Sequence, residues 1–364
     1  MKVCNPNCNY QISQDMSERI NIFRLILTIM VIYIHSYGSV SLFSEVSAAF
    51  ESARWLNDTK YIISQIITRS AVPGFFLLSS ILLYRKPFNW TLNIKKKLKS
   101  LAIPYLILNC SWILLFFVLQ SLSFSSGIFN NPENYVRSWD LRQWCNALFG
   151  VPNNVVPFLY PLWFLRDLLI LNFFSYVIWK LVDKIPELML AGALYLWFFR
   201  SIPNSAVPDY QAVAFWIIGA YIVKRNLHLE KLDKIPKILV IAILAVCINK
   251  LMPDRYAEKY IPLMNLCVSL SLLLTFILCE TIRRTDLNKL LLSLSTYSFS
   301  IYLFHEFTTL FFRKLAASIL PGSVLSQFLQ YMLIPFAVAA FCILLSIILK
   351  KIMPRFYQIL TGGR

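Results

Sequence analysis

The feature that most constrains this chain is a series of long apolar blocks. Residues 20–34 contain only three strongly polar side chains, and residues 261–279 contain no charged one. Crossing the hydrocarbon core of a membrane takes roughly 20 mostly apolar residues in a helix, and several blocks reach that length. The chain is also 58% hydrophobic and only 15% charged, whereas soluble domains are nearer a quarter charged. We therefore predict an all-α polytopic membrane protein.

Hydropathy and loop punctuation predict about ten transmembrane helices. The predicted spans are residues 20–40, 66–84, 101–122, 162–180, 187–200, 210–224, 236–251, 261–281, 294–312 and 328–350. Lys and Arg favour the cytoplasmic side of short loops. With the N-terminus inside, the inside segments hold twice as many Lys and Arg residues as the outside ones. The N- and C-termini are therefore predicted to be cytoplasmic, in a multi-pass protein of the cell (plasma or inner) membrane.

The predicted membrane boundaries also define the domain organisation. Residues 1–19 form a cytoplasmic N-terminal segment, residues 20–350 a transmembrane domain, and residues 351–364 a cytoplasmic tail. The longest outside loop, about 123–161, is rich in aromatic residues, Pro and Asn and has no obvious secondary structure. Loops of this kind are typically lids or binding loops.

The net charge of +17 does not indicate that the protein binds nucleic acid. The basic residues lie in short loops between apolar blocks and do not form one basic face of a folded domain. The eight cysteines are scattered, and the Cys4–Cys8 pair has no second pair or nearby histidine. We therefore expect no metal site.

The first predicted span carries one polar seam. Arg24 and His35 are eleven residues apart, so in a helix they share one face and are separated by about 16 Å along the axis. Ionisable residues within membranes are costly and are functional candidates by default. The alternative is that Arg24 extends to the inner interface and His35 bonds to a neighbouring helix.

Two other spans carry polar side chains with two possible uses. In the ninth, Tyr302 and His305 share one side of the helix, either as an interhelical hydrogen-bond seam or in the chemistry; Glu306 follows directly. In the fourth, Arg166 and Asp167 follow Trp163. In one interpretation these two residues form an interfacial ion pair. In the other, Asp167 orients a histidine and Arg166 faces an anionic ligand.

The predicted inner loop after the second span is strongly basic. It contains Arg85-Lys86 and then Lys95-Lys96-Lys97-Leu98-Lys99. Such clusters commonly hold a protein at the inner membrane surface. The alternative is a dock for a phosphate-rich ligand that arrives from the cytoplasm.

Together these motifs resemble the acyltransferase-3 family of membrane O-acyltransferases. The first span of the family carries a basic residue and, after ten intervening residues, a histidine. Arg24 and His35 match this pattern. Residues 72–80 are similar to its second-span motif, with Ser80 where glycine is usual. The family's Arg-x-x-Arg pair corresponds to Lys96 and Lys99, and lysine lacks the bidentate geometry of arginine.

Two further stretches, 162–165 and 298–305, are also close to family motifs, so the resemblance runs from about residue 18 to 350. It implies transfer of an acyl group, usually acetyl, from cytoplasmic acyl-CoA to a hydroxyl of a carbohydrate. The acceptor would be a surface polysaccharide or a lipid-linked glycan.

The resemblance also implies roles for these residues. His35 would be the general base for the attacking hydroxyl or would carry the acyl group transiently. Arg24 would stabilise developing charge or hold the donor, and Asp167 completes the expected catalytic set. The remaining expected contacts are donor binding by Lys96, Lys99 and Arg85, and acceptor binding by Trp163, Arg166, Tyr302 and His305.

The expected partners are acetyl-CoA as acyl donor, a carbohydrate acceptor and membrane lipid, with no nucleic acid and no metal. A transporter or flippase for a glycan or organic anion is the alternative function. Such folds often have repeated halves with matching Gly- or Pro-broken spans, whereas this chain has nine glycines and no matching halves. Consumption of acetyl-CoA would distinguish the two functions.

Overall fold

The computed structural model of the protein describes residues 2–3, 10–37, 53–122, 135–150, 156–199 and 206–363. Within these ranges the regular structure is helical, apart from the two-residue strands β1 (Lys2–Val3) and β2 (Phe88–Asn89), which pair antiparallel. The predicted all-α class is confirmed. Cys4 and Cys8, for which no metal site is expected, lie outside the described residues.

The α-helices are α1 (Gln14–His35), α3 (Arg54–Tyr61), α4 (Ala71–Tyr84), α5 (Trp90–Lys97), α6 (Ile103–Leu119), α8 (Leu141–Phe149), α9 (Trp163–Lys184), α10 (Pro186–Phe199), α11 (Tyr210–Lys224), α12 (Lys237–Leu251), α13 (Ile261–Arg283), α14 (Asn288–Ser295), α15 (Ser298–Ile319), α16 (Val324–Ile352) and α17 (Pro354–Leu360). Short π segments are η1 (Ile62–Ile67) and η3 (Leu98–Ala102), and short 3-10 segments are η2 (Thr68–Ser70), η5 (Val136–Ser138), η6 (Tyr160–Leu162), η7 (Leu229–Lys234), η8 (Met252–Asp254) and η9 (Glu258–Tyr260).

Five helical stretches of the described chain are long and apolar enough to cross a membrane. They are Arg54–Tyr84, Trp90–Leu119, Tyr160–Lys184, Glu258–Arg283 and Val324–Ile352. The first two join α3 to α4 and α5 to α6 through π or 3-10 segments, and α10 and α11 are shorter apolar helices. Each of the predicted spans overlaps one helix. A multi-pass membrane protein is thus supported, while ten crossings and cytoplasmic termini stay predictions.

Helical structure extends beyond the predicted segment boundaries. Helix α1 already begins at Gln14, where the Ser13 hydroxyl accepts from the Met16 amide at 3.1 Å, and α17 lies in the predicted tail. Part of the predicted outside loop is also helical. There α8 begins with a capping box between Asp140 and Gln143, which is a local signal for the start of a helix. The loop had been predicted from its aromatic, Pro and Asn content, without this signal.

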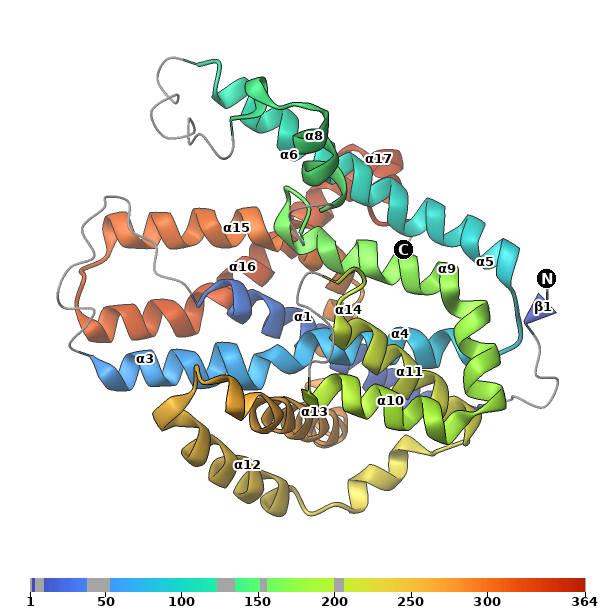
Figure 1. The fold of residues 1–364 in the computed structure, drawn as a ribbon. Helices are drawn as coiled ribbons and strands as arrows, with labels where there is room; N and C mark the ends of the chain where they lie inside the picture. Colours follow the sequence, from blue (N-terminus) through green and yellow to red (C-terminus); the bar gives the residue numbers. More distant parts are fainter. Residues whose placement is uncertain are drawn as a thin grey trace.

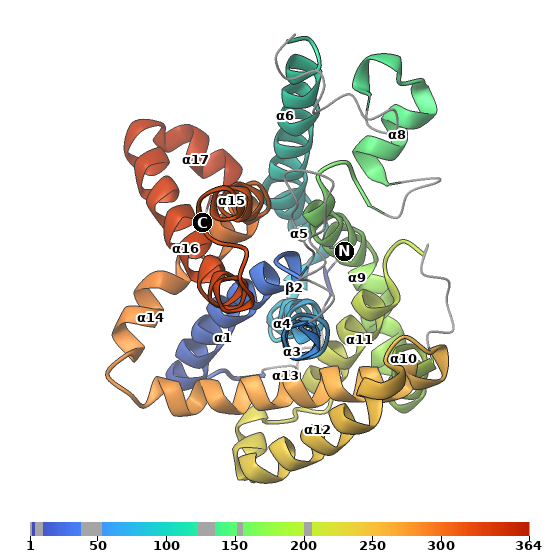
Figure 2. The ribbon, with the colours of Figure 1, turned by 90° about the vertical axis from the view of Figure 1, so that its left-hand side faces the viewer.

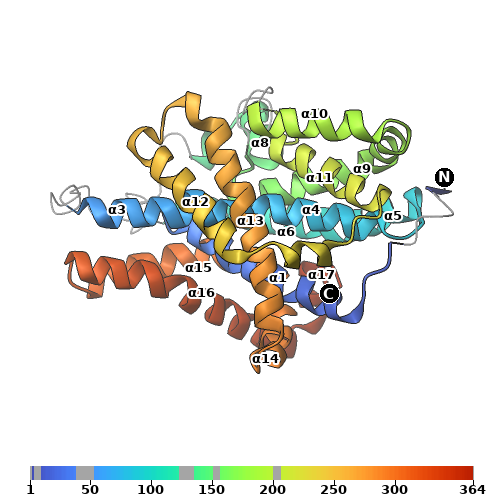
Figure 3. The same cartoon turned by 90° about the horizontal axis from the view of Figure 1, so that it is seen from below.

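The α3–α4 stretch lies in the middle of the molecule. In Figure 2, which looks along it, α1, α15 and α16 lie on one side and α9, α10 and α11 on the other. Figure 3 shows α13 crossing beneath this bundle at a steep angle. In Figure 1, α6 and α8 extend away from the bundle, while β1 lies near the start of α5.

Two glycines allow this central helix to pack closely. A Cβ atom on Gly219 of α11 would lie 2.7 Å from Ser80 Cβ and 2.8 Å from the Leu77 carbonyl oxygen of α4. On another side of α4, a Cβ on Gly74 would lie 2.8 Å from a methyl group of Leu27. Small residues permit such close helix contact where lipid removes the hydrophobic driving force. The Ser80 hydroxyl also donates to the Trp216 carbonyl oxygen at 2.6 Å.

Polar contacts hold the N-terminal end of α1. The buried guanidinium of Arg19 donates to both carboxylate oxygens of Asp233 at 2.8 and 3.0 Å and to the Phe276 carbonyl oxygen of α13. Just before the helix, the Tyr10 hydroxyl donates to the Leu227 carbonyl oxygen at 2.9 Å. Burial raises the pKa of Tyr10 to about 12, so the hydroxyl keeps its proton at physiological pH. These contacts fix α1 and therefore its far end at His35.

The close α4–α11 contact predicts that replacing glycine by alanine destabilises the protein at Gly219 and stabilises it at Gly192. Gly219→Ala should lower the free energy of unfolding by about 1–3 kcal/mol, because the helices must move apart. Gly192→Ala in α10, where a Cβ would meet nothing within 4 Å, should raise it by roughly 0.5–1 kcal/mol through helix propensity. Thermal unfolding of both purified variants in one detergent measures this, and equal shifts would contradict the packing argument.

Candidate active site

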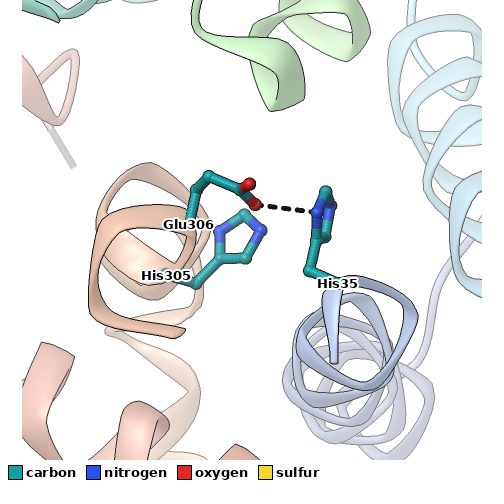
Figure 4. A group of neighbouring side chains, drawn as sticks. All are labelled: His35, His305 and Glu306. Atoms are coloured by element: carbon teal, nitrogen blue, oxygen red, sulfur yellow. Dashed lines mark ion pairs between the residues drawn. The ribbon is translucent and has the colours of Figure 1, made fainter. Parts of the chain in front are cut away.

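The last residue of α1 forms the centre of a charged cluster with α15. His35 Nδ1 lies 2.7 Å from Glu306 Oε2, as Figure 4 shows. Both side chains are largely removed from solvent, with relative exposures of 13% and 34%. A carboxylate at this distance orients the imidazole. Because Nδ1 faces Glu306, Nε2 of His35 is left for a reacting group.

His305 lies beside this pair. Its ring centroid is 4.9 Å from that of His35, and its Nδ1 is 2.7 Å from the Tyr302 carbonyl oxygen. A carbonyl oxygen can only accept, so this contact requires a hydrogen on Nδ1 and leaves Nε2 as the acceptor in the neutral ring. That Nε2 atom is buried, has no hydrogen-bond partner among the described residues and faces the His35 side in Figure 4. It is a second position that could accept a proton next to His35.

A third residue of α15 holds the end of α1. Arg313 Nη1 donates to the His35 carbonyl oxygen at 3.1 Å. The last carbonyls of a helix have no partner within the helix, and a cation there is also favoured by the helix dipole. Helix α15 therefore positions His35 through its side chain and through its backbone.

Two adjoining cavities meet near this cluster. The smaller, of about 50 Å³, is lined by His35, Arg69, Tyr160 and Trp163 among others. The larger, of about 410 Å³, lies further along α1 and has a basic wall. Three aromatic side chains line both cavities and so lie between them: Phe75, Phe164 and Tyr302.

The basic wall of the larger cavity differs partly from the predicted donor site. Lys96 lines it, as expected, but Lys99 and Arg85 do not; Lys86 and Lys97 are there instead. A spacing of three would keep Lys99 on the face of Lys96 in a regular α-helix. The π segment η3 begins at Leu98 and has more residues per turn, so the periodicity changes between the two lysines.

Arg24 and His35 line different cavities of the described structure. Arg24 and Thr28 line the larger one, while His35 lines the smaller one. Arg24 and His35 both lie on the predicted polar face of α1. Because they are eleven residues apart, about 16 Å along the helix axis separates them, and they lie at opposite ends of this face. The expected contribution of Arg24 is therefore to donor binding, and its direct role at the imidazole stays a prediction.

Asp167 is bound to groups other than histidine. Its Oδ1 accepts from Arg166 Nε at 2.9 Å, and its Oδ2 accepts from the Asp209 amide at 2.7 Å. Arg166 Nη1 also donates to the Phe149 carbonyl oxygen at 2.9 Å. The ion-pair alternative is thus observed, and it links α8, α9 and the start of α11. A catalytic role for Asp167 stays a prediction without a recorded contact to support it.

The other predicted acceptor-binding residues lie close to His35. Trp163 and Tyr302 line the smaller cavity, and the Tyr302 hydroxyl donates to the Pro161 carbonyl oxygen at 2.5 Å. His305 packs against His35. Arg166, in contrast, is occupied by Asp167 and the Phe149 carbonyl.

Several residues of the site were missing from the predicted set. Glu306 was expected only as the neighbour of His305, and Lys86, Arg69 and Arg313 were not among the predicted site residues. A charged side chain in an otherwise apolar helix was the available signal for the last two. The partner of Glu306 could not be predicted, because it depends on how α15 packs on α1.

The same cluster has the donor types of a metal site. The ligand atoms of His35, His305 and Glu306 all lie within 4.8 Å of one another. Two imidazoles and one carboxylate are a ligand set that a zinc ion can take. The sequence-based expectation of a site without metal stays a prediction.

Comparison with known proteins identifies the family. The acyltransferase domain family matches residues 17–351. The chain belongs to this acyltransferase family. The acyltransferase is also similar to the succinoglycan biosynthesis protein ExoH of Rhizobium meliloti (strain 1021), with 22% identity over 96% of this chain and 93% of that protein. No solved structure matches it. The predicted enzyme class is confirmed: this is an acyltransferase that transfers groups other than aminoacyl groups.

The ion pair predicts that Glu306 supports catalysis through His35. Glu306→Gln keeps the size of the side chain but removes the charge that stabilises protonated His35, so we expect the acyl-transfer rate to fall about 10²-fold or more. Glu258→Gln is the matched control, because Glu258 is exposed and lies in η9. Equal rates for Glu306→Gln and the control, measured in lipid nanodiscs, would remove Glu306 from the chemistry.

Proposed function

We propose that this acyltransferase moves an acetyl group from acetyl-CoA to a hydroxyl of a carbohydrate, in a surface polysaccharide or a lipid-linked glycan. The observation that carries the proposal is the His35–Glu306 pair next to a large cavity with a basic wall. Family membership supports acyl transfer, and the name of the relative ExoH concerns the biosynthesis of a glycan. The proposed location is the cell membrane.

The larger cavity fits the donor. Arg24, Lys86, Lys96 and Lys97 contribute four basic side chains to its lining, which favours a ligand with several phosphates. Its volume of about 410 Å³ lies within the usual range for small-molecule sites. We propose that this cavity opens to the cytoplasm, where the phosphates of acetyl-CoA bind these side chains while the thioester extends towards the aromatic residues before His35.

The proposed reaction needs one base, and overall it neither takes up nor releases a proton. The imidazole of His35 accepts the proton of the acceptor hydroxyl as its oxygen attacks the thioester carbon. The C–O bond forms, the C–S bond then breaks, and the imidazolium returns the proton to the CoA thiolate. Glu306 stabilises the imidazolium between these steps. In the other route, His35 Nε2 attacks the thioester carbon and the CoA thiolate leaves as the C–S bond breaks. The acceptor oxygen then attacks the acetyl carbon, the C–N bond breaks, and the hydroxyl proton passes to the CoA thiolate.

The proposal predicts that His35→Ala abolishes acyl transfer and leaves the fold intact. The imidazole is the proton acceptor or acyl carrier in either route, and its loss removes a contribution of about 10²–10⁴-fold. His228→Ala is the matched control, because His228 is exposed before η7. Transfer of radiolabelled acetyl groups from acetyl-CoA is measured in nanodiscs. Full activity of His35→Ala would exclude His35, and wild-type protein that ignores acetyl-CoA would favour the transporter alternative.

The proposed donor site predicts which lysine matters. Lys96→Ala should raise KM for acetyl-CoA about 10- to 100-fold, the loss expected for one charged hydrogen bond to phosphate. Lys95→Ala should leave KM unchanged, because Lys95 is exposed and does not line the cavity. Lys99→Ala then tests the sequence-based assignment directly. Equal KM values for the Lys95 and Lys96 variants would contradict donor binding at this wall.

A further inference from the structure

A third cavity lies on the other side of the His35 cavity from the basic wall. It has a volume of about 330 Å³ and lies between the α3–α4 stretch, α11 and α13. It shares Arg69 and Gln211 with the cavity of His35, so the two are adjacent. The three cavities thus follow one another, with His35 in the middle one. Resting on the proposed function, we infer that this third cavity, the polar cavity, binds a sugar ring of the acceptor.

The walls of the polar cavity offer the groups that a sugar requires. Gln65, Gln211 and Asn265 provide amide groups; of these, Gln65 Oε1 already accepts from Arg69, and Asn265 Nδ2 donates to the Trp197 carbonyl oxygen. Tyr61 and Tyr210 provide aromatic rings, and the Tyr61 hydroxyl donates to the Arg255 carbonyl oxygen. Amides and hydroxyls both donate and accept hydrogen bonds, as sugar hydroxyls do, and aromatic faces pack against the apolar face of a sugar ring. The volume is at the lower end of the range for small-molecule sites, which suits one ring better than a longer segment.

Arg69 connects the polar cavity with the catalytic residue. It lies within the apolar Arg54–Tyr84 stretch yet is exposed, and it lines both the polar cavity and the His35 cavity. Its guanidinium donates to Gln65 Oε1 at 2.7 and 3.1 Å, and no ion pair with it occurs in the described part of the chain. An ionisable side chain in a stretch that is apolar enough to cross a membrane is a candidate for a functional contact. At this junction it can hold an oxygen of the acceptor towards His35.

The backbone turns these two side chains into the cavity. The π segment η1 (Ile62–Ile67) contains Gln65, and the 3-10 segment η2 (Thr68–Ser70) contains Arg69. Irregular turns of this kind inside a helix are frequent at functional sites. The same stretch packs tightly elsewhere: the Ser64 hydroxyl donates to the Tyr33 carbonyl oxygen at 2.7 Å. The irregular turns are therefore held by packing.

The acceptor fits the polar cavity better than the donor does. Arg69 is the single basic residue among the lining residues, which also include Asp209, whereas the larger cavity has four basic residues. The phosphates of acetyl-CoA favour the second arrangement. The donor and acceptor can therefore approach His35 from opposite sides of the middle cavity without competing for one space.

Filling the polar cavity tests the inference. Gln65→Trp places a large ring in the polar cavity, and Gln65 lines neither of the other two cavities. Ile63→Trp adds a tryptophan to the same π segment at a residue that lines none of the three. The intact proteins in nanodiscs receive radiolabelled acetyl-CoA and a mixture of the methyl pyranosides of glucose, galactose and mannose. The acetylated sugar and the free acetate are both quantified.

We expect the ratio of acetylated sugar to free acetate to fall at least tenfold in Gln65→Trp and to stay at the wild-type value in Ile63→Trp. An unchanged ratio in Gln65→Trp, or equal losses of both products, would overturn the inference. Acetate release by wild-type protein without acetylation of any of the three sugars would also overturn a site for a single ring. If wild-type protein leaves acetyl-CoA intact, the proposed function itself fails.

Met264→Trp keeps the test decisive if Gln65→Trp does not fold. Met264 of α13 lines the polar cavity from the opposite wall and lines neither of the other cavities. The same fall in the ratio is expected, because the ring occupies the same space. A folded Met264→Trp variant with the wild-type ratio would overturn the inference independently.

Discussion

The close contact between α4 and α11 supports the arrangement of the whole site. Gly219 lets α11 approach the Ser80 side chain and the Leu77 carbonyl of α4, and the Ser80 hydroxyl closes the contact with a hydrogen bond to Trp216. Helix α4 carries Phe75, which lines two of the three cavities. A wider spacing between the two helices would displace Phe75 and open the space around His35. Glycine and serine thus determine the geometry in which the ionisable residues act.

Much of this architecture follows from the sequence because a membrane restricts the options. An apolar block of membrane length must form a helix, so the helical class and the approximate helix positions could be predicted. The same restriction draws attention to polar side chains within these blocks. Arg24 and His35 were selected on that basis, and they line the larger cavity and the His35 cavity, respectively. The family motifs connected these residues with acyl transfer.

What could not be predicted depends on contacts between distant segments. The partner of His35 is Glu306, about 270 residues later in the chain, whereas Asp167 is held by its neighbour Arg166 and by the Asp209 amide. Spacing within one helix says nothing about which carboxylate another helix will present. Lys96 and Lys99 were paired through the family motif, and the π segment η3, which begins between them, changes the helical periodicity.

The aromatic residues between the basic cavity and the His35 cavity have a consequence for the cell. Phe75, Phe164 and Tyr302 line both spaces, so hydrated ions meet apolar rings on the way from one to the other. We propose that the larger cavity opens to the cytoplasm; when the His35 cavity receives the acceptor from the other side of the membrane, only the acetyl group of the donor has to pass between these rings. The enzyme could then use a donor from one compartment and an acceptor from the other while the electrochemical gradient across the bilayer is preserved.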